Sequence, residues 1–538
     1  MKNLTPHRHL SIITALILFV VSPLLYAQTY TDMHDFNNSD GCCANYPSTL
    51  VQGQDGNIYG ATTSGGANFG NIFKITPSGT FTNIYNFDGT HGAGPQGGIS
   101  LGFDGNLYGT TYVGGSGNAG VIFKVTPSGT ETDLYNFTNG TDGGYPRTPP
   151  VQAPDGNLYG VTGNGTNQVL YKLTPAGVFS TIVTIPSQSY SPLIVGTDGN
   201  LYGMTLYGGT YNRGTAFQFS PKTKKLKIIH NFNASVEGGL PYGPLMQGVD
   251  GKLYGSCSAF GSGSGGTLFQ MTTGGSTVTI VNFNSSNPIN GATPFSGVVQ
   301  GSDGFLYGVA SVGGSNGLGV LFKVSTKGAN FTVLHNFGTA DGDTPNATPL
   351  LHTNGKIYGL TYHGGSHTVY GVFYSFDNGL KPFTEQFVYY SGKVGASVTL
   401  LGQGFSNATG VKFGTGAGSF VASTDAYMTA TVDAGATTGK ITVLEPGGNL
   451  VTPQTYKIIP TISGFSPSSG TVGTQVVITG MSLKQTTSVT FGGVKATSFT
   501  VNSDTQVTAT VPTGAKTGKI GIKTTGGSAT SAATFTVT

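Results

Sequence analysis

Eight aromatic, arginine and histidine residues stand in or beside glycine-rich stretches of this sequence and could contact a ligand. They are Tyr112, Tyr145, Arg147, Tyr207, Tyr211, Arg213, His363 and His367. Tyrosine rings can stack on sugar rings, and arginine forks hydrogen-bond to hydroxyl or carboxylate groups, so the set predicts carbohydrate contact. The same side chains could instead serve only to cover glycine-rich loops. The sequence leaves both interpretations open.

Catalytic chemistry finds little support. The four glutamates, at 131, 237, 385 and 445, are scattered, which argues against the paired carboxylates of glycoside hydrolysis. Gly313 to Gly317 fits the nucleophile pattern G-x-S-x-G, but in a repeat loop instead of a strand-to-helix turn. His352, His363 and His367 stand close in sequence, yet no carboxylate or cysteine is evidently placed with them. We therefore expect no catalytic residue, no metal site and no cofactor.

A hexapeptide of the type Asp-Gly-Asn-Leu-Tyr-Gly recurs in the segments that must position these residues. Its tyrosines are separated by 43 to 53 residues and stand at Tyr59, Tyr108, Tyr159, Tyr202, Tyr254, Tyr307 and Tyr358. The unit around Tyr108 predicts four short strands, over 99–103, 106–111, 121–125 and 131–137. Four strands in about 50 residues are typical of one blade of a β-propeller.

The composition of the hexapeptide suits a hairpin. Asp-Gly accepts the positive φ angles of a tight turn, so the repeated aspartates are expected to be turn residues. Leu and the following Tyr point to opposite faces of a strand and can pack against both neighbouring blades. The glycine after Tyr is expected to permit close approach between blades. Residues near 30–36 match the fourth strand of the unit around Tyr108, which predicts that they complete the last blade of a closed, seven-bladed ring.

This topology gives the predicted disc two different faces. The two hairpin turns of every blade lie on one side, which we call the turn face. The loops between second and third strands share the other side with the blade-to-blade connections, and we call it the crossing face. All eight candidate residues fall on the crossing face, where exposed loops on a rigid scaffold usually carry binding residues.

The repeats resemble the GloVer tandem-repeat family of exported bacterial proteins. The resemblance covers about residues 30–379 and rests on the strand Asn106–Thr111, on Gly114-Gly115 and on the strand and turn Val121–Gly129. It implies export and often a separate C-terminal surface-sorting module, but no defined reaction.

A different unit of about 80 residues appears twice after residue 379. Gly435–Ile441 (GATTGKI) matches Gly514–Ile520 (GAKTGKI), and Val411–Gly414 (VKFG) matches Val489–Gly492 (VTFG). Both copies resemble IPT/TIG domains, which implies an immunoglobulin-like fold; the first copy departs at its entry, where Phe387–Tyr390 replaces the usual proline. The predicted architecture is therefore all-β: a seven-bladed β-propeller over 28–379, followed by two immunoglobulin-like β-sandwich domains over 380–458 and 459–538.

The N-terminus and the bulk composition predict export. Residues 1–27 have the basic start, apolar run and small residues of a secretory signal peptide, and no later run predicts a membrane span. The net charge of +3 is too small to suggest nucleic acid. Three cysteines exclude a disulfide framework, and the pairing of Cys42, Cys43 and Cys257 stays open.

Taken together, these features predict a secreted or cell-surface, monomeric and non-catalytic binding or scaffold protein. Its partner is expected to be a polysaccharide or another surface protein, held by the crossing face. The alternative is a propeller enzyme acting on carbohydrate, such as a lyase or a sugar dehydrogenase. Charged side chains converging at the mouth of the central channel would favour that alternative.

Overall fold

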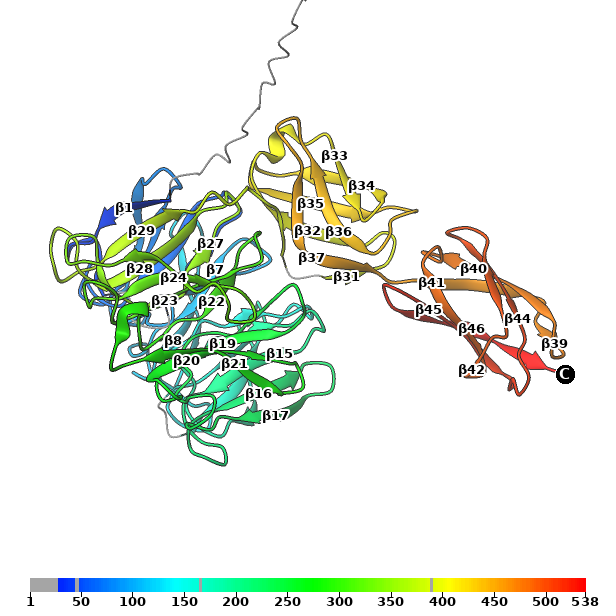
Figure 1. Cartoon of the computed structure of the whole chain (residues 1–538), viewed down its shortest axis with the longest axis horizontal. Coiled ribbons are helices and arrows are strands. Elements are labelled where there is room, and N and C mark those ends of the chain that lie inside the picture. Colours follow the sequence, from blue (N-terminus) through cyan, green and yellow to red (C-terminus); the bar gives the residue numbers. More distant parts are fainter. Residues whose placement is uncertain (1–27, 44–47, 164–166, 388–389) are drawn as a thin grey trace, which may run out of the picture.

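The structure is a computed structural model that describes residues 28–43, 48–163, 167–387 and 390–538. The expected signal peptide and residues 388–389 of the atypical entry lie outside these ranges. The described chain is all-β, with two short 3-10 turns, η1 (Pro288–Asn290) and η2 (Phe405–Asn407). Within it, no helix has the length and apolar character needed to cross a membrane. Figure 1 shows a large body of repeats followed by two smaller bodies.

Residues 29–377 form seven antiparallel sheets of four or five strands, one for each hexapeptide. The innermost strands are β2 (Val51–Gln52), β6 (Ile99–Leu101), β10 (Val151–Gln152), β14 (Ile194–Val195), β18 (Met246–Gln247), β22 (Val298–Gln300) and β27 (Leu350–Leu351). The second strands, which contain the repeated tyrosines, are β3 (Ile58–Thr62), β7 (Leu107–Thr110), β11 (Leu158–Val161), β15 (Leu201–Thr205), β19 (Leu253–Cys257), β23 (Leu306–Ala310) and β28 (Ile357–His363).

The two outer strands of each sheet complete the propeller-like arrangement. The third strands are β4 (Asn71–Ile75), β8 (Val121–Val125), β12 (Val169–Leu173), β16 (Thr215–Ser220), β20 (Ser264–Met271), β24 (Val320–Val324) and β29 (Val372–Asp377). The outermost strands are β5 (Phe81–Asn86), β9 (Glu131–Asn136), β13 (Phe179–Thr184), β17 (Lys225–Asn231), β21 (Thr277–Asn284), β25 (Thr332–Asn336) and, in the last sheet, β1 (Thr29–Asp35). An extra strand, β26 (Asp343–Pro345), pairs with β28.

The aspartate of the hexapeptide has two roles in the turn between innermost and second strands. One carboxylate oxygen of Asp104 accepts the Asn106 N–H at 3.1 Å, which fixes the turn. The other accepts the Tyr108 hydroxyl at 2.9 Å, which fixes the buried ring. The same tyrosine bond recurs with Asp55, Asp155, Asp198, Asp250 and Asp303. The turn role expected from the sequence is therefore confirmed, and the tyrosine bond adds a second reason for the aspartate.

The glycine after each tyrosine makes room within its own sheet. A Cβ at Gly109 would overlap the ring of Phe123, which lies opposite it on the third strand. Gly60 and Phe73 repeat the arrangement in the first sheet. The expectation that this glycine lets neighbouring sheets approach was wrong, because the space is filled by an aromatic ring of the same sheet.

Buried clusters join each sheet to the next. Tyr59 of one sheet shares a cluster with Leu107 of its neighbour, and Tyr108 shares the next cluster with Leu158. The last pair is Tyr358 with Ile58, which joins the last sheet to the first. Leu and Tyr thus pack against different neighbours, as the alternation along a strand predicts.

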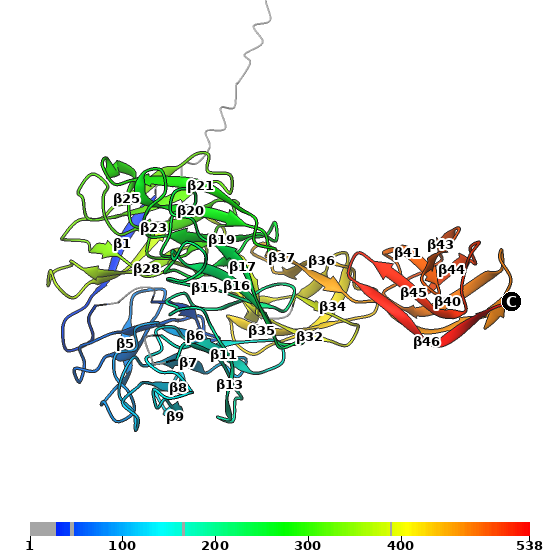
Figure 2. The same ribbon diagram turned by 90° about the horizontal axis from the view of Figure 1, so that it is seen from below.

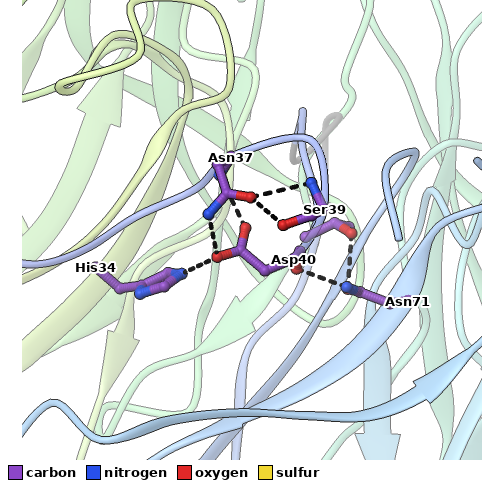
Figure 3. Close-up of polar contacts among 6 residues, drawn as sticks. His34, Asn37, Ser39, Asp40 and Asn71 are labelled. Atoms are coloured by element: carbon purple, nitrogen blue, oxygen red, sulfur yellow. Dashed lines mark hydrogen bonds and ion pairs between the residues drawn. The ribbon is translucent and has the colours of Figure 1, made fainter. Parts of the chain in front are cut away.

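The N-terminal strand strengthens the junction between the last and first sheets. The expected pairing is confirmed, because β1 pairs antiparallel with β29, from Thr29 opposite Asp377 to Asp35 opposite Val372. His34 stacks on Phe81 of the first sheet, with ring centroids 4.0 Å apart. In the loop that follows β1, Asp40 accepts hydrogen bonds from the His34 ring and from Asn37, and its carbonyl accepts one from Asn71 of β4 (Figure 3).

The remaining strands form two bodies that extend from the repeats in a row (Figure 2). Residues 385–458 form one eight-stranded sheet around a buried core. Its strands are β30 (Glu385–Phe387), β31 (Ser391–Gly392), β32 (Ser397–Leu401), β33 (Gly410–Phe413), β34 (Gly416–Ala422), β35 (Tyr427–Val432), β36 (Gly439–Leu444) and β37 (Leu450–Ile458).

Residues 461–537 form two sheets with a second core, and their last residues lie at the end farthest from the repeats in both views (Figures 1 and 2). The strands are β38 (Thr461–Ser466), β39 (Ser469–Gly470), β40 (Gln475–Met481), β41 (Thr486–Phe491), β42 (Val494–Lys495), β43 (Phe499–Val501), β44 (Gln506–Thr510), β45 (Gly518–Thr524) and β46 (Ser528–Val537).

The eight-stranded sheet rests on the turn face of the repeats. The Thr424 hydroxyl donates to the carbonyl of Gln54, in an Asp-Gly turn, at 2.6 Å. The Thr353 hydroxyl donates to the carbonyl of Gly402 at 3.0 Å. Leu401 is buried in a cluster with Leu101. One end of the channel between the innermost strands is therefore covered by the segment that follows the repeats.

Two of the three cysteines are joined. Cys42 and Cys43 form a disulfide between adjacent residues. Cys257 is a buried free cysteine, and burial raises the pKa of its thiol.

Candidate functional site

The crossing face carries one side chain per repeat at the start of each innermost strand. Each stands four residues before the residue that pairs with the repeated tyrosine; those described are Gln96, Arg147, Tyr190, Tyr242, Phe295 and Asn346. Innermost strands run from the crossing face to the Asp-Gly turn. These six side chains therefore surround the channel mouth on the crossing face.

Four of the six, together with Tyr112, form a continuous row of side-chain contacts, in which Tyr190 and Tyr242 are tilted and Tyr242 and Phe295 meet edge to face. The guanidinium of Arg147 lies 4.2 Å from the centre of the Tyr112 ring and 4.7 Å from that of Tyr190. The Tyr190 and Tyr242 rings are 5.2 Å apart, and the Tyr242 and Phe295 rings 5.1 Å apart. We call these five residues the aromatic arc. It spans several successive repeats.

Proline-containing connections hold the arc in place. Tyr145, Leu240 and Thr293 have positive φ values of 50°, 60° and 57°, and each precedes a proline and then a mouth residue. Their N–H groups donate to carbonyls of the preceding sheet's loop, at 2.7 to 3.0 Å. Such a backbone is costly for residues other than glycine and persists only where the surroundings hold it. The mouth residues are thus presented from a rigid backbone.

The chemistry of the arc is that of a binding platform. Arg147 donates a hydrogen bond to Gln96 and is stacked between two rings, so its orientation is set before any ligand arrives. The five arc residues are half-buried, with part of each side chain accessible. Flat aromatic and guanidinium surfaces suit the apolar faces of sugar rings, and guanidinium N–H groups can donate to hydroxyl or carboxylate oxygens.

The structure gathers only three of the eight candidate residues predicted from the sequence. Tyr112, Tyr145 and Arg147 meet, with the two tyrosine rings 5.5 Å apart. The mouth also contains residues that were not predicted from the sequence: Gln96, Tyr190, Tyr242 and Phe295. Their shared position in the repeat was a usable signal, but the residue type at that position differs from repeat to repeat.

The other five candidates lie in two separate places. Tyr207 and Tyr211 are exposed in the loop after β15, and Arg213 of the same loop lies over Phe260, 4.6 Å from the ring centre. In the last repeat, His363 lies 3.7 Å from the Asp343 carboxylate, and His367 is exposed. The fold separates His352, which is buried on the turn face with its Nε2 3.0 Å from the Gly56 carbonyl. The described residues hold no group of three or more metal-ligating side chains.

Carboxyl groups come together at two places away from the mouth: Asp32 with Asp35 on the outermost strand β1, and Glu131 with Asp133 on β9. Glu131 and Asp133 lie on the outermost strand β9, on the same side. Burial, and then the charge of Asp133, raise the pKa of Glu131 to about 8. Neither pair was predicted from the sequence, since only the glutamates were considered. At the rim both pairs are far from the mouth, where Arg147 is the only charged residue among the six described mouth positions.

Comparisons with known proteins agree with this architecture of repeats. The Gloeobacter/Verrucomicrobia repeat matches residues 18–189, 163–374 and 245–492, and the IPT/TIG domain matches residues 460–537. The class is thus a propeller-like repeat protein with a C-terminal IPT/TIG domain. The chain belongs to the Gloeobacter/Verrucomicrobia repeat family. No curated protein matches the sequence.

The solved structures that match the chain have low sequence identity and TM-scores below 0.5. A fungal alcohol oxidase of the AA5 family, in complex with copper, is 13% identical over 95% of this chain and 98% of its own, with a TM-score of 0.45. A putative 6-phosphogluconolactonase from Bacteroides uniformis is 17% identical over 53% and 83%, with a TM-score of 0.38. A surface glycan-binding protein from Prevotella bryantii is 15% identical over 28% and 41%, with a TM-score of 0.22.

Proposed function

We propose that this chain is an exported, non-catalytic binding protein that holds polysaccharide on the aromatic arc of its crossing face. In this proposal residues 28–379 are a closed, seven-bladed β-propeller, and residues 380–458 and 459–538 are two immunoglobulin-like modules that carry it at a cell surface. The protein acts as a monomer. No catalytic residue, metal or cofactor takes part.

The observation that carries the proposal is the unbroken series of contacts from Tyr112 through Arg147 and Tyr190 to Tyr242 and Phe295. Aromatic rings lose little conformational entropy on binding, and these are already held by one another. The mouth has a single charged residue among its described positions. Several converging charged side chains there would instead have favoured a carbohydrate-active enzyme. Tyr145 extends the platform beside Tyr112.

The two outlying groups, Tyr207 with Tyr211 and Arg213, and His363 with His367, are proposed as secondary contacts for a long chain. A polysaccharide that crosses the mouth could reach loops of other repeats. A surface protein as partner is the competing proposal, and the same face would serve it.

Glycan-array screening of the mature chain from residue 28 tests the proposal, followed by titration of the best ligand. Tyr242→Ala should weaken binding about tenfold or more. Removing an aromatic side chain from the centre of a binding surface costs roughly 1–3 kcal/mol of binding free energy. Arg147→Lys should weaken it as well, because lysine cannot stack as a plane. Tyr211→Ala, at an exposed ring that is proposed only as a secondary contact, is the matched control and should weaken binding less than Tyr242→Ala.

Loss of binding in the control but not in the arc variants would move the site to the loop after β15. An array with no bound glycan would reject the polysaccharide proposal. Release of shortened or oxidised sugar from any bound ligand would establish the enzymatic alternative.

A further inference from the structure

The innermost strands line a partly open chamber of about 400 Å³ behind the covered turn face. Its walls come from β2, β6, β10, β14 and β27, and its floor comes from Glu385, Phe387, Tyr390 and Leu401 of the eight-stranded sheet. A second cavity of about 220 Å³ shares Glu385 and Tyr390 and extends along β18 and β22. The volume of the first cavity is within the range of small-molecule sites.

The chamber wall is mainly apolar, because its glutamine side chains are hydrogen-bonded to other groups of the protein. Leu50, Leu101, Val195 and Leu351 line it. Its glutamines are committed elsewhere: both ends of the Gln52 amide bond to Thr353, at 2.8 and 3.0 Å. Gln152 likewise bonds to Phe103 N and to the Gly156 carbonyl, each at 2.7 Å. Hydrocarbon placed here would be removed from water, at a gain of about 25 cal/mol per Å².

Strand β30 directs one carboxyl group toward this chamber. Phe387 packs on Phe103 of the repeats, with ring centres 5.8 Å apart, so that face of β30 is turned to the channel. Glu385 is two residues away and shares the face. Gln386 points to the opposite side, where its amide nitrogen donates to Thr452 and to the Gln454 carbonyl.

Among the residues that the structure describes, none provides a cationic partner for Glu385. It is the only residue with a charged side chain among the described residues that line the two cavities. Glu385 has an accessible side chain, and it is one of the residues that line the chamber. Burial raises its pKa to about 7. Tyr390 is the other titratable group facing it, and burial raises the pKa of that phenol, so it stays neutral.

We propose that the chamber binds a small apolar molecule that carries one ammonium group. The ammonium pairs with the Glu385 carboxylate, and the hydrocarbon lies against Leu101, Val195 and Leu351. A carboxylate without a partner in apolar surroundings is unfavourable, and an incoming cation removes that penalty. This site is separate from the aromatic arc and does not depend on the polysaccharide proposal.

Calorimetric titration of the mature chain at pH 8 with n-hexylamine, 1-hexanol and hexanoate tests the charge requirement. Hexylammonium should bind at least tenfold more tightly than hexanol, and hexanoate should bind most weakly. Glu385→Gln should abolish the preference for the amine while leaving hexanol binding unchanged. Glu445→Gln, a change of another glutamate of the same body that lines neither cavity, is the matched control and should behave as the native chain.

Two further measurements keep the proposal falsifiable. Val195→Phe adds a ring to the chamber wall and should weaken binding of both hexylammonium and hexanol. Amine affinity should fall between pH 8 and pH 5 as Glu385 becomes protonated, while hexanol affinity stays constant. Equal affinity for amine and alcohol in the native chain, a preference that survives Glu385→Gln, or no binding of either probe would overturn the proposal.

Discussion

The two faces of the repeat disc are built by the same seven repeats but differ in variability and in what covers them. On the turn face the hexapeptide makes nearly identical turns, and the eight-stranded sheet rests on them through Thr424, Gln403 and Leu401. On the crossing face the connections differ in length and residue type, and they carry the aromatic arc. Uniform turns therefore suit permanent docking, and the varied connections suit recognition.

The largest effect is expected from weakening the contact between the eight-stranded sheet and the turn face. Leu401→Ala removes a side chain that is 6% exposed and packs with Leu101, so it should weaken docking by about 2–5 kcal/mol. Limited proteolysis should then cut near residues 380–390 much faster than in the native chain. Val472→Ala, at a side chain that is 52% exposed, is the control. Unchanged cleavage would mean that the docking does not depend on this contact.

On the crossing side, the next effect concerns the loop after β1. Asp40→Ala removes the acceptor for the His34 ring and for two N–H groups of Asn37 (Figure 3). Unfolding free energy should fall by roughly 1–3 kcal/mol, the usual result of leaving part-buried donors without a partner. Urea denaturation measures it. Ser39→Ala is a milder change in the same loop, and an equal loss there would show that the loop, not the carboxylate, matters.

A pH-dependent effect is expected from the carboxyl group beneath the covered face. The pKa of Glu385 is raised from 4.5 to about 7, so between these values the folded chain binds more protons than the unfolded chain. Stability should therefore decrease as pH rises through this window. In Glu385→Gln that part of the decrease should disappear, and the melting temperature at pH 8 should be higher than in the native chain. Melting curves at pH 5 and pH 8 would contradict this if the variant showed the native pH dependence.

The smallest effect is expected from changing one of the repeated Asp-Gly turns of the turn face. Asp104→Ala leaves the Tyr108 hydroxyl and the Asn106 N–H without their acceptor, at a cost of about 1 kcal/mol. Asp104→Asn should cost less, because Asn354 in the last repeat bonds to both Lys356 N and the Tyr358 hydroxyl. Differential scanning calorimetry distinguishes the two. Equal losses would show that the last repeat's asparagine is not equivalent to the other repeats' aspartates.

Most of the architecture was predictable because the turns and strands of each repeat depend on residues that are close together in the sequence. The turn at Asp104, the strand through Tyr108 and the pairing of β1 with the last sheet all follow from residues within one unit or from a matched unit. The site was predicted only in part. Arg147 and Tyr112 stood out by type, whereas Tyr242 and Phe295 look like ordinary loop residues until the repeats are placed side by side.

The amino-acid sequence by itself determined the strands, the hairpin turns and the packing of Leu and Tyr against successive sheets, because these depend on backbone preference and on alternation along a strand. Only the tertiary structure decided which face is covered and where Glu385 lies. Those facts depend on contacts such as Thr424 with Gln54, which are 370 residues apart in the chain. No local pattern encodes such a contact, since it exists only once both surfaces have formed.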